Sequence, residues 1–157
     1  ATETKAKSVD LNSKYIAFST HAFTPEEYDN YNEPGIVLSL VNDEKNDGVL
    51  TSSEIINLKI NNYLTVLSAC NTGSGLSSSS ESFTGLANSF LYAGSKNLIV
   101  SHWSVETYST ELIMIEFFDK MGVLNVKESL RNAKIKILNN ETYNHPFYWA
   151  PFIHLGT

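Results

Sequence analysis

Residues 63–70 read YLTVLSAC, and this stretch decides the fold class. Its apolar residues run almost without interruption, which is typical of a parallel strand covered on both faces. A Ser- and Gly-rich segment over 71–82 follows and predicts a mobile surface loop. Apolar residues at helical spacing over 83–91 then predict a helix that stops at Gly94. Strand, loop and helix in this order form the repeating unit of an α/β protein.

The same alternation continues on both sides of this stretch. Short apolar runs predict further strands at 15–19, 36–41, 49–50, 98–103 and 147–155, and helical patterns begin at Thr51 and cover 110–120 and 126–139. Asn46-Asp47-Gly48 predicts a turn, and Thr51 with Glu54 predicts a capping box. We therefore expect an α/β sandwich with a largely parallel central sheet. In such sheets the reacting groups lie beyond the carboxyl ends of the strands.

Composition and charge narrow the class of function. The chain has 157 residues, one cysteine and a formal net charge of -6. A single cysteine excludes an intramolecular disulfide and favours a reducing, cytoplasmic compartment. The chain lacks a Lys/Arg cluster and a run of about 18 apolar residues, so we expect neither nucleic acid nor membrane as a partner. The histidines and the cysteine show no metal-ligand spacing and no P-loop is present, so no metal or cofactor is expected.

Two reactive side chains directly follow predicted strands. His21 follows the strand at 15–19, and Cys70 follows the strand at 63–68. The two residues are 49 positions apart (70 minus 21). Neighbouring strands lie about 5 Å apart, so an imidazole and a thiol can meet at such ends. Histidine is the usual base that activates a cysteine, and the helix after Cys70 supplies backbone N–H groups for an oxyanion. A single cysteine at the end of a buried strand is more often a core residue, which is the alternative.

Several ordered segments resemble the signature blocks of CHAT domains, which are caspase- and separase-like modules often attached to tetratricopeptide (TPR) repeats. They read AFSTHA at 17–22, DGVLTSSEI at 47–55, VLSACNTG at 66–73, FTGLANSFLYAG at 83–94, SHWSV at 101–105, and HP at 145–146 with WAPF at 149–152. The resemblance covers about 15–156. It implies a caspase-like cysteine endopeptidase in which His21 and Cys70 form the catalytic dyad. It also implies that the backbone N–H groups of Cys70 and Ala22 form the oxyanion hole.

Further site residues follow from the same resemblance. In caspase-like enzymes the region after the next strand contributes to the pocket for the residue before the cut, which implies substrate-binding roles for Trp103 and Glu106. A carboxylate there would favour a basic substrate side chain, and the alternative for Glu106 is a solvated surface residue. His102 is a further candidate for lining the cleft, with a packed histidine as the alternative. We expect His145 and His154 to be structural.

The start of the chain differs from the family pattern. Residues 1–14 are polar and are expected to form a boundary segment, with the peptidase core over 15–157. In the caspase-like fold one or two strands and a helix precede the histidine strand, and they are not apparent here. We therefore expect an exposed apolar sheet edge that an upstream region or a partner chain covers, TPR-like in the family. The alternative to an enzyme is a non-catalytic or partner-activated interaction module.

Overall fold

The computed structural model of the chain describes residues 1–8, 13–28, 30–42, 44–69 and 79–156, apart from the side chains of 69 and 79–84. Its main sheet has the order β1-β5-β6-β7, built from β1 (Tyr15–Thr20), β5 (Leu64–Ala69), β6 (Asn97–Ser101) and β7 (Phe152–Gly156). β1, β5 and β6 are parallel, and β7 pairs antiparallel with β6. The predicted mixed α/β fold with a largely parallel sheet is confirmed.

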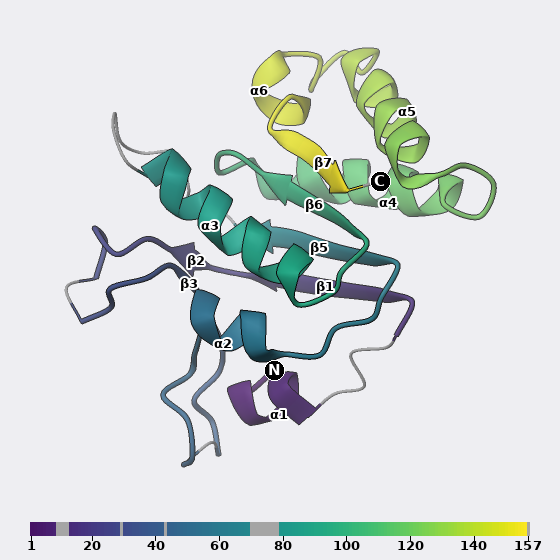
Figure 1. Cartoon of the computed structure of the whole chain (residues 1–157). Helices are drawn as coiled ribbons and strands as arrows, with labels where there is room; N and C mark the ends of the chain where they lie inside the picture. Colours follow the sequence, from purple (N-terminus) through teal and green to yellow (C-terminus); the bar gives the residue numbers. More distant parts are fainter. Residues whose placement is uncertain (9–12, 29, 43, 70–78, 157) are drawn as a thin grey trace.

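Helices cover both faces of this sheet (Figure 1). α2 (Ser52–Asn57) and α3 (Ser79–Tyr92) pack on one face, where Leu67 and Leu98 join the core. α4 (Thr107–Lys120) and α5 (Val126–Leu138) pack on the other, where Val66 and Ile99 join a second core. Because β5 and β6 contribute side chains to both cores, apolar residues follow one another in their sequences instead of alternating strictly with polar ones.

A small antiparallel sheet begins where β1 ends. It contains β2 (Ala22–Phe23), β3 (Gly35–Val37) and β4 (Val49–Thr51) in that order. The strand expected at 36–41 is shorter, because β3 ends opposite the first residue of β4, and Leu40 and Val41 are 61% and 69% exposed. Gly48 has a φ of 82° at the predicted turn.

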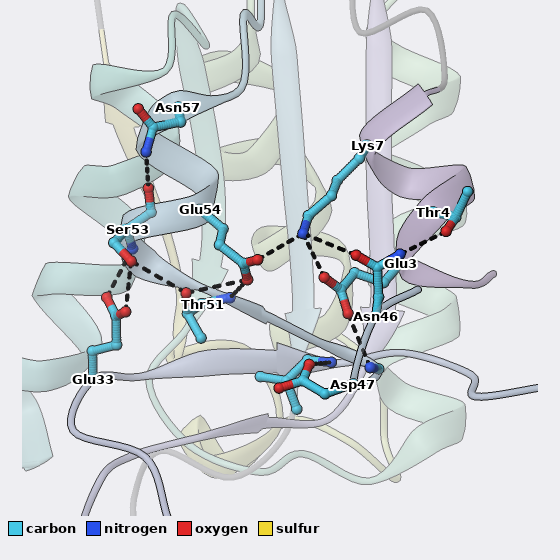
Figure 2. Close-up of polar contacts among 12 residues, drawn as sticks. Glu3, Thr4, Lys7, Glu33, Asn46, Asp47, Thr51, Ser53, Glu54 and Asn57 are labelled. Atoms are coloured by element: carbon cyan, nitrogen blue, oxygen red, sulfur yellow. Dashed lines mark hydrogen bonds and ion pairs between the residues drawn. The ribbon is translucent and has the colours of Figure 1, made fainter. Parts of the chain in front are cut away.

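The polar N-terminal segment contains a helix, α1 (Glu3–Ser8), that sequence analysis did not predict (Figure 2). Glu3 is buried and accepts a hydrogen bond from the Gly48 backbone N–H at 2.9 Å. Lys7 Nζ lies 2.5 Å from Glu3 Oε1 and 2.6 Å from Glu54 Oε1. Burial lowers the pKa of Lys7, but the hydrogen bonds to the two carboxylates outweigh it and raise this pKa overall. Charged contacts thus attach α1 to the β3–β4 hairpin and to α2. The pattern of apolar residues in the sequence does not reveal such contacts.

Three element boundaries also differ from the predicted ones. α3 begins at Ser79, inside the segment expected to be a loop, and residues 71–78 of that segment lie outside the described part of the chain. α4 begins at Thr107 because Glu106 caps it. α6 (Pro146–Trp149) occupies the start of the strand expected at 147–155, since proline suits the first helical position and the His145 ring accepts a hydrogen bond from the backbone N–H of residue 147.

Candidate active site

His21 lies between the two sheets, directly after β1 and before β2. The parallel register of β1 and β5 pairs Thr20 with Ala69, the last residue of each strand. The positions that come after this pair in the sequence are His21 and Cys70. His21 is exposed, whereas Cys70 lies outside the described residues. The described backbone therefore brings the two strand ends together, as the sequence predicted.

A cavity of about 260 Å³ opens at these strand ends. Its wall combines the ends of β1 and β5 with the start of α4, and it is lined by Ser19, Thr20, His21, Ser68, Val105, Thr107 and Thr110. Ser19 and Ser68 are partners in the parallel register, so both side chains point to the same face of the sheet. That face is the one that α4 covers. His21 therefore borders a small space that is otherwise lined mostly by residues with a hydroxyl group.

Backbone hydrogen bonds hold His21 in place on the side of the small sheet. The His21 carbonyl accepts from the Val37 N–H at 2.8 Å, and the Thr20 hydroxyl donates to the Val37 carbonyl. Hydrogen-bonded and non-hydrogen-bonded pairs alternate along antiparallel strands, so the next pair, Ala22 with Ile36, is of the non-hydrogen-bonded kind. The N–H of the buried Ala22 consequently points away from β3.

Trp103 and Glu106 lie near this region but do not line the cavity. The Trp103 indole N–H donates to the Phe147 carbonyl at 3.0 Å. Glu106 is the N-cap of α4, and its carboxylate accepts from the backbone N–H groups of Tyr108 and Ser109, each at 2.8 Å. These bonds, that of Tyr108 first, lower the pKa of Glu106. The residues on either side of Glu106, Val105 and Thr107, line the cavity instead.

Sequence analysis did not identify the five hydroxyl residues of the cavity, which are Thr20 at the end of β1, Ser19 and Ser68 of the two strands, and Thr107 and Thr110 of α4. For the serines a signal was present, because each stands two positions before a proposed catalytic residue. A strand places residues two positions apart on one face. Thr107 and Thr110 belong to the first turn of α4, and only the packing of that helix against the sheet brings them to the strand ends.

The remaining histidines have separate positions. His102 is exposed just after β6. His145 caps α6 with Nδ1, and His154 Nε2 lies 2.8 Å from Asn97 Oδ1. Burial, and secondarily the nearby charge of Lys127, lower the pKa of His154. Within the described ranges, no group of three or more His, Cys, Asp or Glu side chains is arranged to hold a metal ion.

A three-layer α/β architecture, with a histidine at the carboxyl edge of a largely parallel sheet, is compatible with a caspase-like class of fold. The sequence profile of the CHAT domain family matches residues 1–157, and the chain belongs to this family, which is related to the caspase-like cysteine peptidases. The chain is also similar to the human (Homo sapiens) protein named Tetratricopeptide repeat protein 28, with 24% identity over 110 residues. That match covers 69% of this chain and 4% of the human protein's length. Among the described residues, no helix is long and apolar enough to span a membrane.

Proposed function

We propose that this chain is the core of a caspase-like cysteine endopeptidase, with Cys70 as the nucleophile and His21 as the general base. The observation that carries the proposal is the pairing of Thr20 with Ala69 at the carboxyl ends of two adjacent parallel strands. Residues that directly follow such a pair start about one strand spacing apart, roughly 5 Å. The cavity of about 260 Å³ beside His21 has room for a single substrate side chain, which supports the proposal.

In the proposed reaction His21 accepts the proton of the Cys70 thiol, and the thiolate sulfur attacks the carbonyl carbon of a peptide bond. The tetrahedral intermediate collapses, the C–N bond breaks, and His21 gives its proton to the leaving amine. Water then attacks the thioester while His21 takes one of its protons. The acid product leaves, and the proton returns to the sulfur.

The backbone N–H groups of Ala22 and Cys70 are the proposed donors to the oxyanion. An Ala22 N–H that points away from β3 supports this role, because it is not turned into the small sheet. Removing one such donor typically slows an enzyme by about 10²–10³-fold. For substrate binding, we propose that Trp103 and Glu106 act together with Thr107 and Thr110, the cavity residues in the first turn of α4.

The test is cleavage of a proteome-derived peptide library, followed by mass spectrometry, with the wild-type chain and three variants. We expect Cys70→Ala and His21→Ala to lose at least about 10³-fold in rate while keeping the wild-type circular dichroism spectrum. His145→Asn is the matched control, because this histidine caps α6 outside the cavity and Asn also caps helices. Wild-type cleavage by Cys70→Ala contradicts the proposal.

One observation favours a second candidate, a module that becomes active only with a partner. His21 directly follows β1, yet β1 stands at the edge of the described sheet, and its side chains alternate between exposed and half-buried. An edge strand presents unpaired N–H and C=O groups that can pair with another chain, and a strand or helix that covers β1 would help to position His21. TPR repeats are the proposed covering element, as in the name of the human relative. Cleavage that appears only after a TPR segment is added supports this candidate.

A further inference from the structure

A second cavity lies far from His21, at the opposite edge of the sheet. It has a volume of about 450 Å³ and runs beside α5, with α6 and β7 forming its other wall. Its lining includes Lys127, Arg131, Lys134, Ile135, Leu138 and Trp149. The groove therefore combines three cations with an apolar floor and an aromatic wall.

Within the described residues, the three cations are not neutralised by acidic partners. In the part of the chain that the structure describes, none of Lys127, Arg131 and Lys134 has an ion pair, and no acidic side chain lines the groove. Lys136 on the same helix differs, since it pairs with Glu116 of α4. Burial lowers the pKa of Lys134, as expected for an ammonium group that has lost water without gaining an anion. A bound carboxylate would reverse that effect.

The spacing of the cations limits the kind of ligand. Positions 127, 131 and 134 lie on one face of α5, and seven residues of helix span about 10 Å. A single phosphate or small carboxylate cannot reach both ends of this row. Two turns of a second helix can present several carboxylates over the same length, with apolar side chains on its inner face.

The apolar part of the groove fits such a helix. Ile135 and Leu138 are 38% and 46% exposed, and Trp149 is half-buried across from them. Trp and Arg are the residue types that most often dominate binding energy at protein interfaces. A space of about 450 Å³ holds a few anchoring side chains rather than a whole peptide.

We propose that the groove between α5, α6 and β7 binds an acidic, amphipathic helical segment of a partner protein. Its apolar side chains would enter beside Trp149, and its carboxylates would pair with Lys127, Arg131 and Lys134. This inference is independent of the proposed peptidase activity, because no residue of the groove lines the His21 cavity.

The test uses a fluorescein-labelled helical peptide of about 18 residues, with Leu at i, i+3, i+4 and i+7 and Glu on the flanks, and a twin with Lys in place of Glu. Fluorescence anisotropy with the whole chain should show binding of the acidic peptide that weakens as salt rises. Lys127→Glu/Arg131→Glu should weaken it at least 10-fold. Lys45→Glu/Lys59→Glu changes the charge equally at exposed positions elsewhere, and should stay within 2-fold of wild type.

Leu138→Gln tests the apolar half of the groove without altering charge, and we expect it to weaken binding about 5-fold. Circular dichroism melts confirm that each variant is folded. The proposal is wrong if the acidic peptide does not bind, if the Lys twin binds equally well, or if the two double variants weaken binding to the same extent. Binding to phosphatidylserine vesicles in place of the acidic peptide also contradicts it.

Discussion

His21 owes its position to the residues on either side of it. Thr20 ends β1 in register with Ala69, and Ala22 begins the small sheet opposite Ile36. The backbone is therefore fixed by hydrogen bonds before and after a histidine whose side chain is exposed. A rigid backbone beneath an accessible imidazole suits a group that must hold and return a proton.

Glu106 gives a prediction that depends on pH. Its carboxylate accepts two backbone N–H bonds at the start of α4, which lower its pKa in the folded state. A carboxyl group whose pKa falls on folding stabilises the protein above its unfolded pKa of about 4.3, and this contribution disappears as the pH falls through the folded pKa. We expect Glu106→Gln to lower the thermal midpoint by a few degrees at pH 7 and to have little effect near pH 2.5.

Thermal melts at the two pH values check this expectation. Glu111→Gln, an exposed position on the same helix, is the matched control and should be neutral at both. An equal loss for Glu106→Gln at pH 7 and at pH 2.5 would mean that the charged cap does not stabilise α4.

At the scale of elements, the turn between α3 and β6 rests on Gly94. Its φ is 114°, and a Cβ atom added there would lie 2.0 Å from the Ile60 carbonyl oxygen. We expect Gly94→Ala to lower the free energy of unfolding by more than about 2 kcal/mol, from backbone strain and a clash that cannot relax. Chemical denaturation measures this. Gly85→Ala, inside α3 with open space among the described atoms, should instead be neutral or stabilising by up to about 1 kcal/mol.

The docking of α1 gives another prediction at this scale. Glu3 is 2% exposed and accepts the Gly48 N–H, so Glu3→Ala leaves a buried donor without its partner. We expect a loss of about 1–3 kcal/mol in unfolding free energy by chemical denaturation. Glu3→Gln keeps an oxygen that can accept the hydrogen bond from the Gly48 N–H. We therefore expect it to lose clearly less unfolding free energy than Glu3→Ala. Equal losses for the two variants would show that the hydrogen bond contributes little.

The sequence predicts strands well where both faces of the strand are buried. It predicts helices well where the capping residues lie close together in the sequence. β5 and β6 follow from continuous apolar runs, and α2 follows from Thr51 and Glu54, whose carboxylate accepts the Thr51 N–H at 3.0 Å. α6 was missed because its aromatic residues favour a strand in isolation, while Pro146 and its cap favour a helix. α1 was missed because the contacts that attach it, Lys7 to Glu54 and the Gly48 N–H to Glu3, are polar and join residues far apart in the sequence.

At the scale of the whole molecule, the two edges of the sheet differ. β1 ends the sheet with exposed and half-buried side chains, whereas β7 ends it beside α5 and the cationic groove. β1 is thus an edge strand of the described sheet, and its covering by an upstream region or a partner chain stays a prediction. The sequence predicts this edge from the resemblance, but it does not predict the groove, because α5, α6 and β7 contribute to it only after folding.

The sequence predicts only the part of the candidate site that depends on neighbouring strands. Two reactive residues after two strands predict proximity once the sheet is parallel, and the pairing of Thr20 with Ala69 supports it. The hydroxyl lining of the cavity requires α4 to pack across the strand ends, which is a long-range contact. Short-range patterns therefore identify the proposed dyad and leave its surroundings open.

The reactivity of the single thiol tests the central claim most directly. Because the chain has one cysteine, the mass increase on alkylation with iodoacetamide reports Cys70 alone. We predict that the alkylation rate of the wild-type chain rises with an apparent pKa well below the ordinary thiol value of about 8.5, and that His21→Ala returns it to that value. His145→Asn is the control and should behave like the wild-type chain. An apparent pKa near 8.5 for both the wild-type chain and His21→Ala would contradict the pairing of His21 with Cys70.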